Sequence, residues 1–332
     1  MAEFRKDPIT GRWVIIASQR AQRPRQLGAA SPTRQDEPCP FCAGNEAMTP
    51  PELWASRDAN TQANAPGWHV RVVPNKYPAV ENASQWHGSS DNFYQAQNGV
   101  GAHEVIVESA DHLVNIGALS EDGFANVLRA YRARMRALRT ERRWRYLLLY
   151  KNQGDRAGAT LEHIHSQLIA LPHVPREAAD ELNGAQAHYL ATQRCIYCAI
   201  IERATRERQR LVFGHEKFVA LCPFAPRFAY ETWILPRTHA AAFEESSDQD
   251  LLDCGRALHE IIARLNRALD DPPFNYFLHS APTDDSAGPH YHWHWEILPQ
   301  LSRAAGFELG SGSHINAVAP EQAAKLLRDV AL

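Results

Sequence analysis

The sequence is poor in the features that mark several specialised classes of protein. Cysteine is scarce, with six in 332 residues, which excludes the disulfide framework of small secreted domains. Basic charge is not in excess, because the formal net charge is −3, so we expect no nucleic-acid partner. No apolar run is long enough to span a bilayer, and residues 1–7 lack the apolar core of a secretory signal. We therefore expect a cytoplasmic globular protein with no membrane partner, long enough for two moderate domains.

Four of the six cysteines form two Cys-x2-Cys pairs, and each pair is followed by two histidines. The first set is Cys39, Cys42, His112 and His163, and the second set is Cys195, Cys198, His239 and His290. In both sets the two histidines are 51 residues apart. Two thiolates and two imidazoles are the ligands of a tetrahedral structural zinc, so the pattern predicts two Zn2+ ions per chain. A reduced cysteine pair without metal is the alternative for the second set.

A repeat of this size predicts two related halves, residues 1–180 and residues 181–332. Each half contains short apolar segments typical of strands and one long helical pattern, at 120–142 and at 248–269. The expected strands are 13–17, 70–74, 103–107, 146–150, 168–172, 218–222, 231–235, 274–279 and 293–297. Strands in series around a single helix favour an antiparallel α+β fold over a parallel sheet.

The first helical pattern is rich in arginine, and two interpretations are open. Its apolar residues fall on one stripe, which predicts an amphipathic helix with solvated arginines. These residues are Val127, Leu128, Tyr131, Met135 and Leu138. A surface for an anionic partner is the alternative.

The segment best suited to chemistry runs from Gly158 to Gln167. Alternate residues of a strand face the same side, so His163, His165 and Gln167 are expected together after a small Gly-Ala turn. If His163 binds metal, His165 is left as an imidazole nucleophile or base, which suits phosphoryl chemistry near neutral pH. Gln167 can donate its amide N–H to a phosphoryl oxygen as charge develops there. The alternative is that these histidines are all metal ligands or core residues.

Over nearly the whole chain, these motifs resemble the galactose-1-phosphate uridylyltransferase family of the histidine-triad (HIT) superfamily. The resemblance rests on residues 7–15 with 20–24, 39–45 and 75–78, and on His163-x-His165-x-Gln167. Small HIT hydrolases end this triad in histidine, whereas the transferase branch ends it in glutamine. The resemblance implies two HIT-like halves, each an antiparallel sheet with one long helix, and a homodimer.

The resemblance also implies a mechanism and a set of site residues. His165 would attack the α-phosphorus of a nucleoside diphosphate sugar, expel the sugar 1-phosphate and pass the nucleotidyl group to a phosphorylated acceptor. Gln167 would steady the transferred phosphate. The implied substrate-binding residues are Arg20, Arg23, Asn75, Asn152, Thr160, Arg303 and Glu308. From the residues alone, Arg20 and Arg23 would be ordinary surface charges.

Two departures from the family's pattern bear on the activity. Well-known members have an iron-type site of Glu and His in the second half, whereas Cys195 and Cys198 resemble a two-zinc branch that includes ADP-glucose phosphorylases. Glu181 would then be only a helix residue. Residues 301–310 contain no lysine, whereas the uridylyltransferases carry one in their C-terminal segment that helps to bind the hexose phosphate. Arg303 could substitute for it, with Glu308 holding the sugar hydroxyls.

The expected activity is transfer of UMP from UDP-glucose to a hexose 1-phosphate, galactose 1-phosphate. One alternative is an ADP-glucose phosphorylase-type adenylyl transfer to inorganic phosphate. Another is a zinc-stabilised nucleotide-binding module without turnover.

The second half contains a related histidine segment that we expect to be inactive. Aligning the strands at 168–172 and 295–299 places His290, His292 and His294 opposite His163, His165 and Gln167. The aromatic residues of this segment suit packing or framing of the sugar better than phosphate binding. A second active site is the alternative, because the spacing is that of a full histidine triad.

Overall fold

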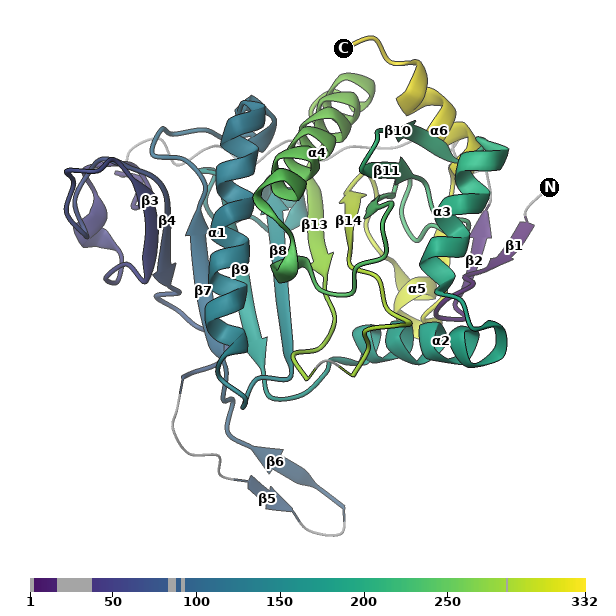
Figure 1. Cartoon of the computed structure of the whole chain (residues 1–332), viewed down its shortest axis with the longest axis horizontal. Helices are drawn as coiled ribbons and strands as arrows, with labels where there is room; N and C mark the ends of the chain where they lie inside the picture. Colours follow the sequence, from purple (N-terminus) through teal and green to yellow (C-terminus); the bar gives the residue numbers. More distant parts are fainter. Residues whose placement is uncertain (1–2, 17–37, 83–87, 91–92, 285) are drawn as a thin grey trace.

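A ten-stranded sheet runs through the computed structural model, which describes residues 3–16, 38–82, 88–90, 93–284 and 286–332 (Figure 1). In spatial order its strands are β10 (Leu211–Gly214), β11 (Phe218–Leu221), β12 (Thr232–Pro236), β14 (His294–Pro299), β13 (Phe274–His279), β8 (Tyr146–Gln153), β9 (His165–Leu171), β7 (Ala102–Val107), β4 (Trp68–Pro74) and β3 (Trp54–Arg57). Every pairing in this sheet is antiparallel. The expected antiparallel α+β fold is confirmed.

The two halves of the sheet repeat one another about the junction between β8 and β13. Outward from the junction the first half places β8, β9, β7, β4 and β3, and the second half places β13, β14, β12, β11 and β10. At the junction Tyr276 lies opposite Lys151, so the sheet is continuous between the halves. The expected boundary at residue 180 falls inside helix α2 (Arg176–Thr192). The division into two domains stays a prediction.

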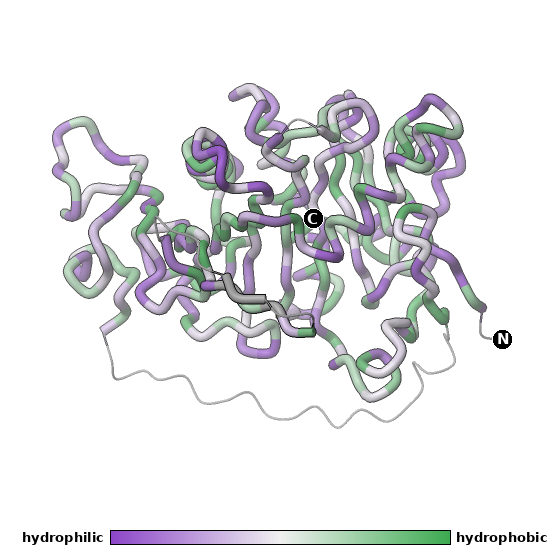
Figure 2. The backbone as a smooth tube through the Cα atoms, turned by 90° about the horizontal axis from the view of Figure 1, so that it is seen from below, coloured by the Kyte–Doolittle hydropathy of each residue, from purple (hydrophilic) through white to green (hydrophobic). Residues whose placement is uncertain are grey.

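Helices α1 (Glu121–Arg139) and α4 (Asp248–Leu269) lie side by side across one face of the sheet (Figure 1), and the view from below shows the same helical layer (Figure 2). Ser120 begins α1 by accepting a hydrogen bond from Gly123 N at 3.1 Å, and Ser247 begins α4 through a reciprocal capping box with Asp250. The apolar stripe expected on α1 is buried against the core. The apolar stripe of the amphipathic interpretation is therefore confirmed. Its arginines are not all solvated, because Arg132, Arg134 and Arg139 form ion pairs with Asp248, Glu104 and Glu244.

The remaining elements surround this sheet. Strands β1 (Glu3–Lys6), β2 (Trp13–Ile16) and β15 (His314–Asn316) form a small sheet in which β15 runs parallel to β2. Strands β5 (Gly88–Ser90) and β6 (Gln95–Gln97) form a separate hairpin. The other helices are α3 (Ile196–Glu207), α5 (Gly306–Ser311) and α6 (Pro320–Asp329). Among the described residues, no helix combines the length and the apolar character that a membrane crossing requires.

Candidate active site and metal centres

His165 begins strand β9, and its backbone surroundings select one tautomer of its ring. Nδ1 lies 2.8 Å from the carbonyl oxygen of His163, which can only accept a hydrogen bond. The proton therefore resides on Nδ1, and Nε2 keeps a free lone pair. Burial, and next the charge of Lys151, lower the pKa of His165, which favours the neutral ring. Such an imidazole is equipped to act as a nucleophile.

The side-chain oxygen of Gln167 accepts two hydrogen bonds from side chains on or next to neighbouring strands. Its Oε1 accepts hydrogen bonds from His103 Nε2 at 2.8 Å and from Asn75 Nδ2 at 3.3 Å. The structure thus brings Asn75 and Gln167 together. Sequence reasoning missed His103, although it lies on an expected strand and points to the same face as Gln167.

A buried ion pair lies next to strand β9 and forms a hydrogen bond with its backbone. Lys151 Nζ donates to Glu108 Oε2 at 2.5 Å and to the His165 carbonyl oxygen at 3.0 Å. Glu108 also accepts hydrogen bonds from Tyr131, Ser166 and Tyr276. Tyr276 belongs to the second half, so this network connects the two halves next to the backbone of His165.

The other residues implied in substrate binding are distributed differently. Asn152 accepts a hydrogen bond from Asn275 Nδ2 at 2.8 Å, and its own Nδ2 lies 3.5 Å from the Gly158 carbonyl oxygen. Thr160 is exposed in the same loop region before β9. Arg20 and Arg23 lie outside the described residues.

Arg303 and Glu308 do not join the His165 site within this chain. Both belong to the segment around α5, which packs beside β15 and is separated from β9 by β8, β13 and β14 (Figure 1). Arg303 is exposed, and Glu308 uses its carboxylate to accept a hydrogen bond from Ala305 N at 3.0 Å. Their roles in substrate binding stay predictions.

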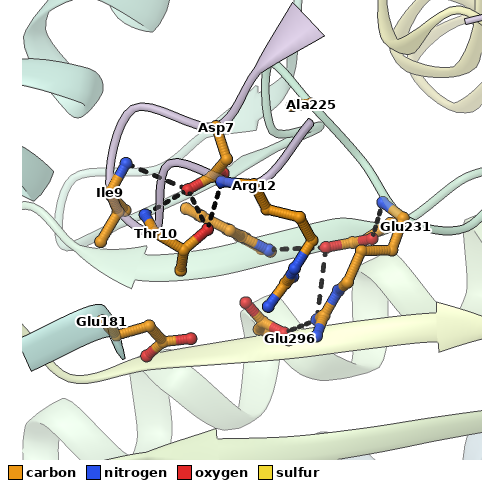
Figure 3. A pocket seen from close by; sticks show the side chains of 10 residues that line it. Asp7, Ile9, Thr10, Arg12, Glu181, Ala225, Glu231 and Glu296 are labelled. Atoms are coloured by element: carbon orange, nitrogen blue, oxygen red, sulfur yellow. Dashed lines mark hydrogen bonds and ion pairs between the residues drawn. The ribbon is translucent and has the colours of Figure 1, made fainter. Parts of the chain in front are cut away.

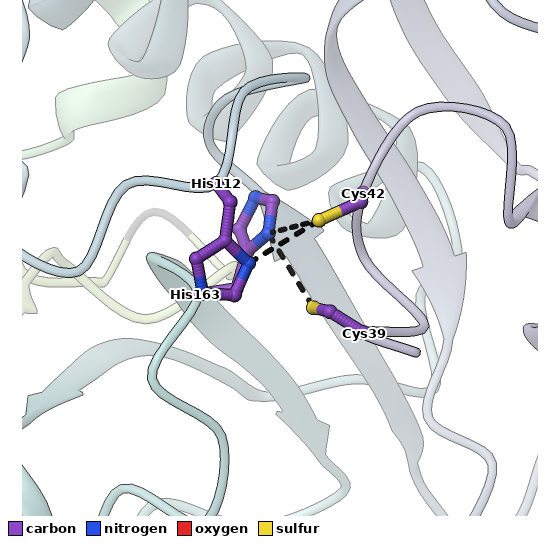
Figure 4. A group of neighbouring side chains, drawn as sticks. All are labelled: Cys39, Cys42, His112 and His163. Carbon is purple, nitrogen blue, oxygen red and sulfur yellow. Dashed lines mark hydrogen bonds between the residues drawn. The ribbon is translucent and has the colours of Figure 1, made fainter. Parts of the chain in front are cut away.

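The first Cys-His set comes together as expected (Figure 4). Its four ligand atoms lie within 4.8 Å of one another, in a group formed by Cys39, Cys42, His112 and His163. His163 directs Nδ1 at both sulfurs, 3.6 Å away, while its Nε2 donates to the Ser109 carbonyl oxygen at 2.9 Å. A second hydrogen bond of this type orients a metal-binding histidine. The donor set therefore fits a zinc ion with all four positions supplied by protein.

The second set also converges, but the structure corrects one ligand. The group is Cys195, Cys198, His239 and His292, and it does not include His290. His292 Nδ1 lies 3.6 Å from Cys198 Sγ, and His292 Nε2 donates to the Pro236 carbonyl oxygen at 2.9 Å. His290 instead lies in the turn before β14, with its ring 6.4 Å from that of Tyr189.

The error arises from the alignment of the two halves. His163 lies two residues before β9, and His292 lies two residues before β14. His294 is accordingly the counterpart of His165, because its Nδ1 donates to the His292 carbonyl oxygen at 3.0 Å. Glu296 is then the counterpart of Gln167. The equal spacing of 51 residues was accidental, since the true interval between His239 and His292 is 53 residues.

A third buried group was not expected from the sequence. It consists of Glu181, His279, His294 and Glu296, whose ligand atoms also lie within 4.8 Å of one another. The rings of His279 and His294 stack with centroids 5.0 Å apart, and the Nε2 atom of each has no hydrogen-bond partner among the described residues. Two carboxylates and two imidazoles with free nitrogens can hold a divalent cation. Glu181 therefore belongs to a group that can bind a cation, whereas from the sequence we expected it to be only a helix residue.

A small pocket beside this third group is lined largely by charged side chains (Figure 3). Arg227 forms ion pairs there with Glu296 and with Glu231. Burial alone would raise the pKa of Glu296, but the charge of Arg227 together with His294 and His279 outweighs burial and lowers that pKa. Glu296 is thus held as a carboxylate, either as a cation ligand or as the partner of Arg227.

Comparison with known proteins places these groups in a known family. Residues 1–175 match the family model described as galactose-1-phosphate uridyl transferase, N-terminal domain. The chain is 34% identical to ADP-glucose phosphorylase of Arabidopsis thaliana, over 99% of this chain and 93% of that protein. It is 26% identical to a galactose-1-phosphate uridylyltransferase of Thermotoga maritima, over 99% of this chain and 98% of that protein.

Solved structures show the same likeness. The crystal structure of ADP-glucose phosphorylase from Arabidopsis thaliana with bound ADP-glucose has a TM-score of 0.85 at 33% identity, and covers 100% of both chains. A uridylyltransferase structure has a TM-score of 0.77 at 27% identity, and covers 99% of this chain and 97% of that one.

Proposed function

Because the chain belongs to the galactose-1-phosphate uridyl transferase family, we propose that it transfers a nucleotidyl group from a nucleoside diphosphate glucose through His165. The observation that carries this proposal is the hydrogen bond from His165 Nδ1 to the His163 carbonyl oxygen, which leaves the Nε2 lone pair available. The donor that we favour is ADP-glucose, and the acceptor is inorganic phosphate.

The reaction proceeds in two displacements at one phosphorus. His165 Nε2 attacks the α-phosphorus, a P–N bond forms, and the bond to the bridging oxygen breaks with release of glucose 1-phosphate. An oxygen of inorganic phosphate then attacks the same phosphorus, the P–N bond breaks, and ADP is released. The proton on Nδ1 stays shared with the His163 carbonyl oxygen throughout, so the ring needs no other base to expose Nε2. The Gln167 amide donates to an α-phosphoryl oxygen as negative charge gathers on it.

The Cys-His sets have a supporting role in this proposal. Each set supplies four protein ligands and leaves no position for water, which is the pattern of a structural zinc. A zinc held by His163 would fix the residue whose carbonyl oxygen orients His165. The third group could hold a further cation between α2 and the strands β13 and β14, where it would also be structural.

The choice of donor rests on similarity. Of the two relatives compared, the ADP-glucose phosphorylase is the more similar in sequence, at 34% against 26% identity. Transfer of UMP from UDP-glucose to galactose 1-phosphate, which the sequence favoured, is the second candidate because the family model and the Thermotoga relative carry that activity in their names. A homodimer and a cytoplasmic location stay predictions.

The decisive experiment combines two donors with two acceptors. We expect radiolabelled ADP-glucose with phosphate to turn over faster than UDP-glucose with galactose 1-phosphate, and the reverse order would establish the second candidate. Protein denatured in alkali, in which a P–N bond to histidine survives, should carry the labelled nucleotide, which a binding module without turnover would not. His165→Ala should abolish this label, whereas His173→Ala, an exposed histidine beyond the end of β9, should keep it. Full labelling of His165→Ala would refute the proposed nucleophile.

A further inference from the structure

The orientation of the Gln167 amide depends on a chain of hydrogen bonds that starts at the backbone. Asn75 follows β4, His103 lies in β7 and Gln167 lies in β9, so three neighbouring strands contribute. In the antiparallel pair β7–β9, Val105 lies opposite Gln167 and His103 lies opposite Ile169. Because residues two apart on a strand share a face, the side chains of His103 and Gln167 meet on the same side of the sheet.

The backbone determines the tautomer of His103. The Ala79 N–H donates to His103 Nδ1 at 3.1 Å, and a backbone N–H can only donate. His103 Nδ1 must therefore carry a lone pair, which places the ring proton on Nε2. Burial lowers the pKa of His103, which agrees with a neutral ring. The Nε2–H then donates to Gln167 Oε1 at 2.8 Å.

Asn75 reinforces the same orientation. Its Oδ1 accepts a hydrogen bond from Tyr77 N at 2.9 Å, so its amide nitrogen must point the other way. That nitrogen donates to Gln167 Oε1 at 3.3 Å. Asn75 Nδ2 and His103 Nε2 lie 3.1 Å apart as two donors directed at one acceptor. Each donor is thus fixed by a separate backbone N–H.

The consequence concerns the other end of the Gln167 amide. The two ends of a glutamine amide have nearly the same shape, so packing alone does not choose between them. Two donors on Oε1 hold the NH2 group on the opposite side, and no hydrogen bond among the described residues uses Gln167 Nε2. A reversed amide would present its carbonyl oxygen to an anionic phosphoryl group and repel it.

We propose that His103 is a positioning residue that, with Asn75, fixes the Gln167 amide so that its NH2 group faces the phosphoryl group transferred by His165. This inference rests on the proposed role of Gln167 in that transfer. In this role His103 acts through Gln167 and not on the substrate. It acts by making the correct donor available before the substrate arrives, which is the condition for electrostatic stabilisation without reorganisation.

The test is a double-mutant cycle on the rate of nucleotidyl-enzyme formation in a single turnover, with saturating ADP-glucose and UDP-glucose in separate series. Loss of one such donor costs roughly a hundred- to a thousandfold in rate, which is the fall expected for Gln167→Ala. His103→Leu removes the orientation but keeps the donor, so we expect a smaller fall of roughly tenfold or more. His103→Gln, which keeps a donor near the position of Nε2, should recover most of the rate. The KM should change little in either His103 variant.

The cycle separates the inference from the function on which it rests. Added to Gln167→Ala, the His103→Leu change should cause no further fall, because there is no amide left to orient. Multiplicative effects of the two changes would overturn the positioning role. If Gln167→Ala alone leaves the rate unchanged, the proposed function of Gln167 fails first.

A second measurement reads the tautomer in the wild-type protein itself and uses a variant only to assign the signal. Long-range proton–nitrogen NMR on protein labelled in histidine reports the tautomer of each ring, and His103→Gln assigns the signal of His103. We expect the Nε2–H form in the wild-type protein. The Nδ1–H form, or a charged ring at neutral pH, would overturn the proposal.

Discussion

Replacement of Glu108 by glutamine should destabilise the protein by about 3–5 kcal/mol, because it leaves the charge of Lys151 buried without its partner. Lys151 is 1% exposed and Glu108 is 2% exposed. Lys151 Nζ lies 2.5 Å from Glu108 Oε2, and Glu108 Oε1 accepts from Tyr131, Ser166 and Tyr276. A glutamine that keeps its oxygen toward the hydroxyls must turn its NH2 group toward the ammonium. One buried acceptor is then replaced by a donor facing a cation.

The size of the effect can be measured by thermal unfolding. At about 2.1 cal/mol/K of unfolding entropy per residue, a chain of 332 residues has roughly 0.7 kcal/mol/K. A loss of 3–5 kcal/mol should therefore lower the Tm by about 4–7 °C in calorimetry near pH 7. The matched control is Glu108→Gln combined with Lys151→Met, which removes both charges and should lie within about 2 kcal/mol of the wild type.

The pH dependence gives a second check on the same pair. Burial alone would raise the pKa of Glu108, but the charge of Lys151 and the hydrogen bonds outweigh burial and lower the pKa below its ordinary value of 4.5. The ionised carboxylate therefore stabilises the folded protein above that pH, and this contribution is lost as the pH falls below it. The difference between wild type and Glu108→Gln should shrink in acid. The reasoning would be refuted if Glu108→Gln were as stable as the wild type at neutral pH while Glu108→Gln combined with Lys151→Met were much less stable.

Two further predictions concern the second metal set and the packing of α2. His292→Ala should lower the metal content by roughly one ion per chain in elemental analysis, whereas the adjacent His290→Ala should keep it, and equal loss in both variants would contradict the corrected assignment. Gly184→Ala should lower the Tm although alanine favours helices by about 1 kcal/mol, because a Cβ at this position would lie 1.7 Å from the Ile9 carbonyl oxygen. Gly310→Ala, where a Cβ meets nothing within 4 Å, is the control. A Tm of Gly184→Ala equal to that of the control would show that α2 and the Ile9 turn separate readily.

The sequence predicted those parts of the fold that local signals determine. Helix α4 begins and ends at the expected residues, 248 and 269, because the capping box at Ser247 and the apolar periodicity lie within the segment itself. Strand β13 likewise matches 274–279. The short strands β10 and β15 were missed because their apolar runs are three residues or fewer, whereas the four-residue strands β2 and β11 were found from apolar runs of five residues.

Prediction of the site failed where distant segments meet. The pair Cys195 and Cys198 correctly predicted a second Cys-His set. Which histidine completes that set depends on the length of the loop before β14, and the preference of zinc for histidine does not determine that length. Glu181 and His279 gave no signal because they come together only when α2 packs against the sheet. His103 was equally hidden, since its partner Gln167 is 64 residues away and only the register of β7 and β9 brings them together.

The corrected alignment also gives a physical reason for our proposal that the chemistry belongs to the first half. His165 and His294 are equivalent rings, each with Nδ1 bonded to the carbonyl oxygen of the histidine two residues before it. Near His165 the next position on the strand face is Gln167, an uncharged donor that attracts a phosphoryl oxygen. Near His294 that position is Glu296, whose carboxylate lies 3.8 Å from Nε2. A fixed negative charge there repels a phosphate and attracts a cation, and the rings of Tyr197 and His279 close the remaining approach at 5.0 Å. The same backbone arrangement therefore suits the proposed nucleophile in one half and a cation-binding group in the other, through the exchange of one amide for one carboxylate.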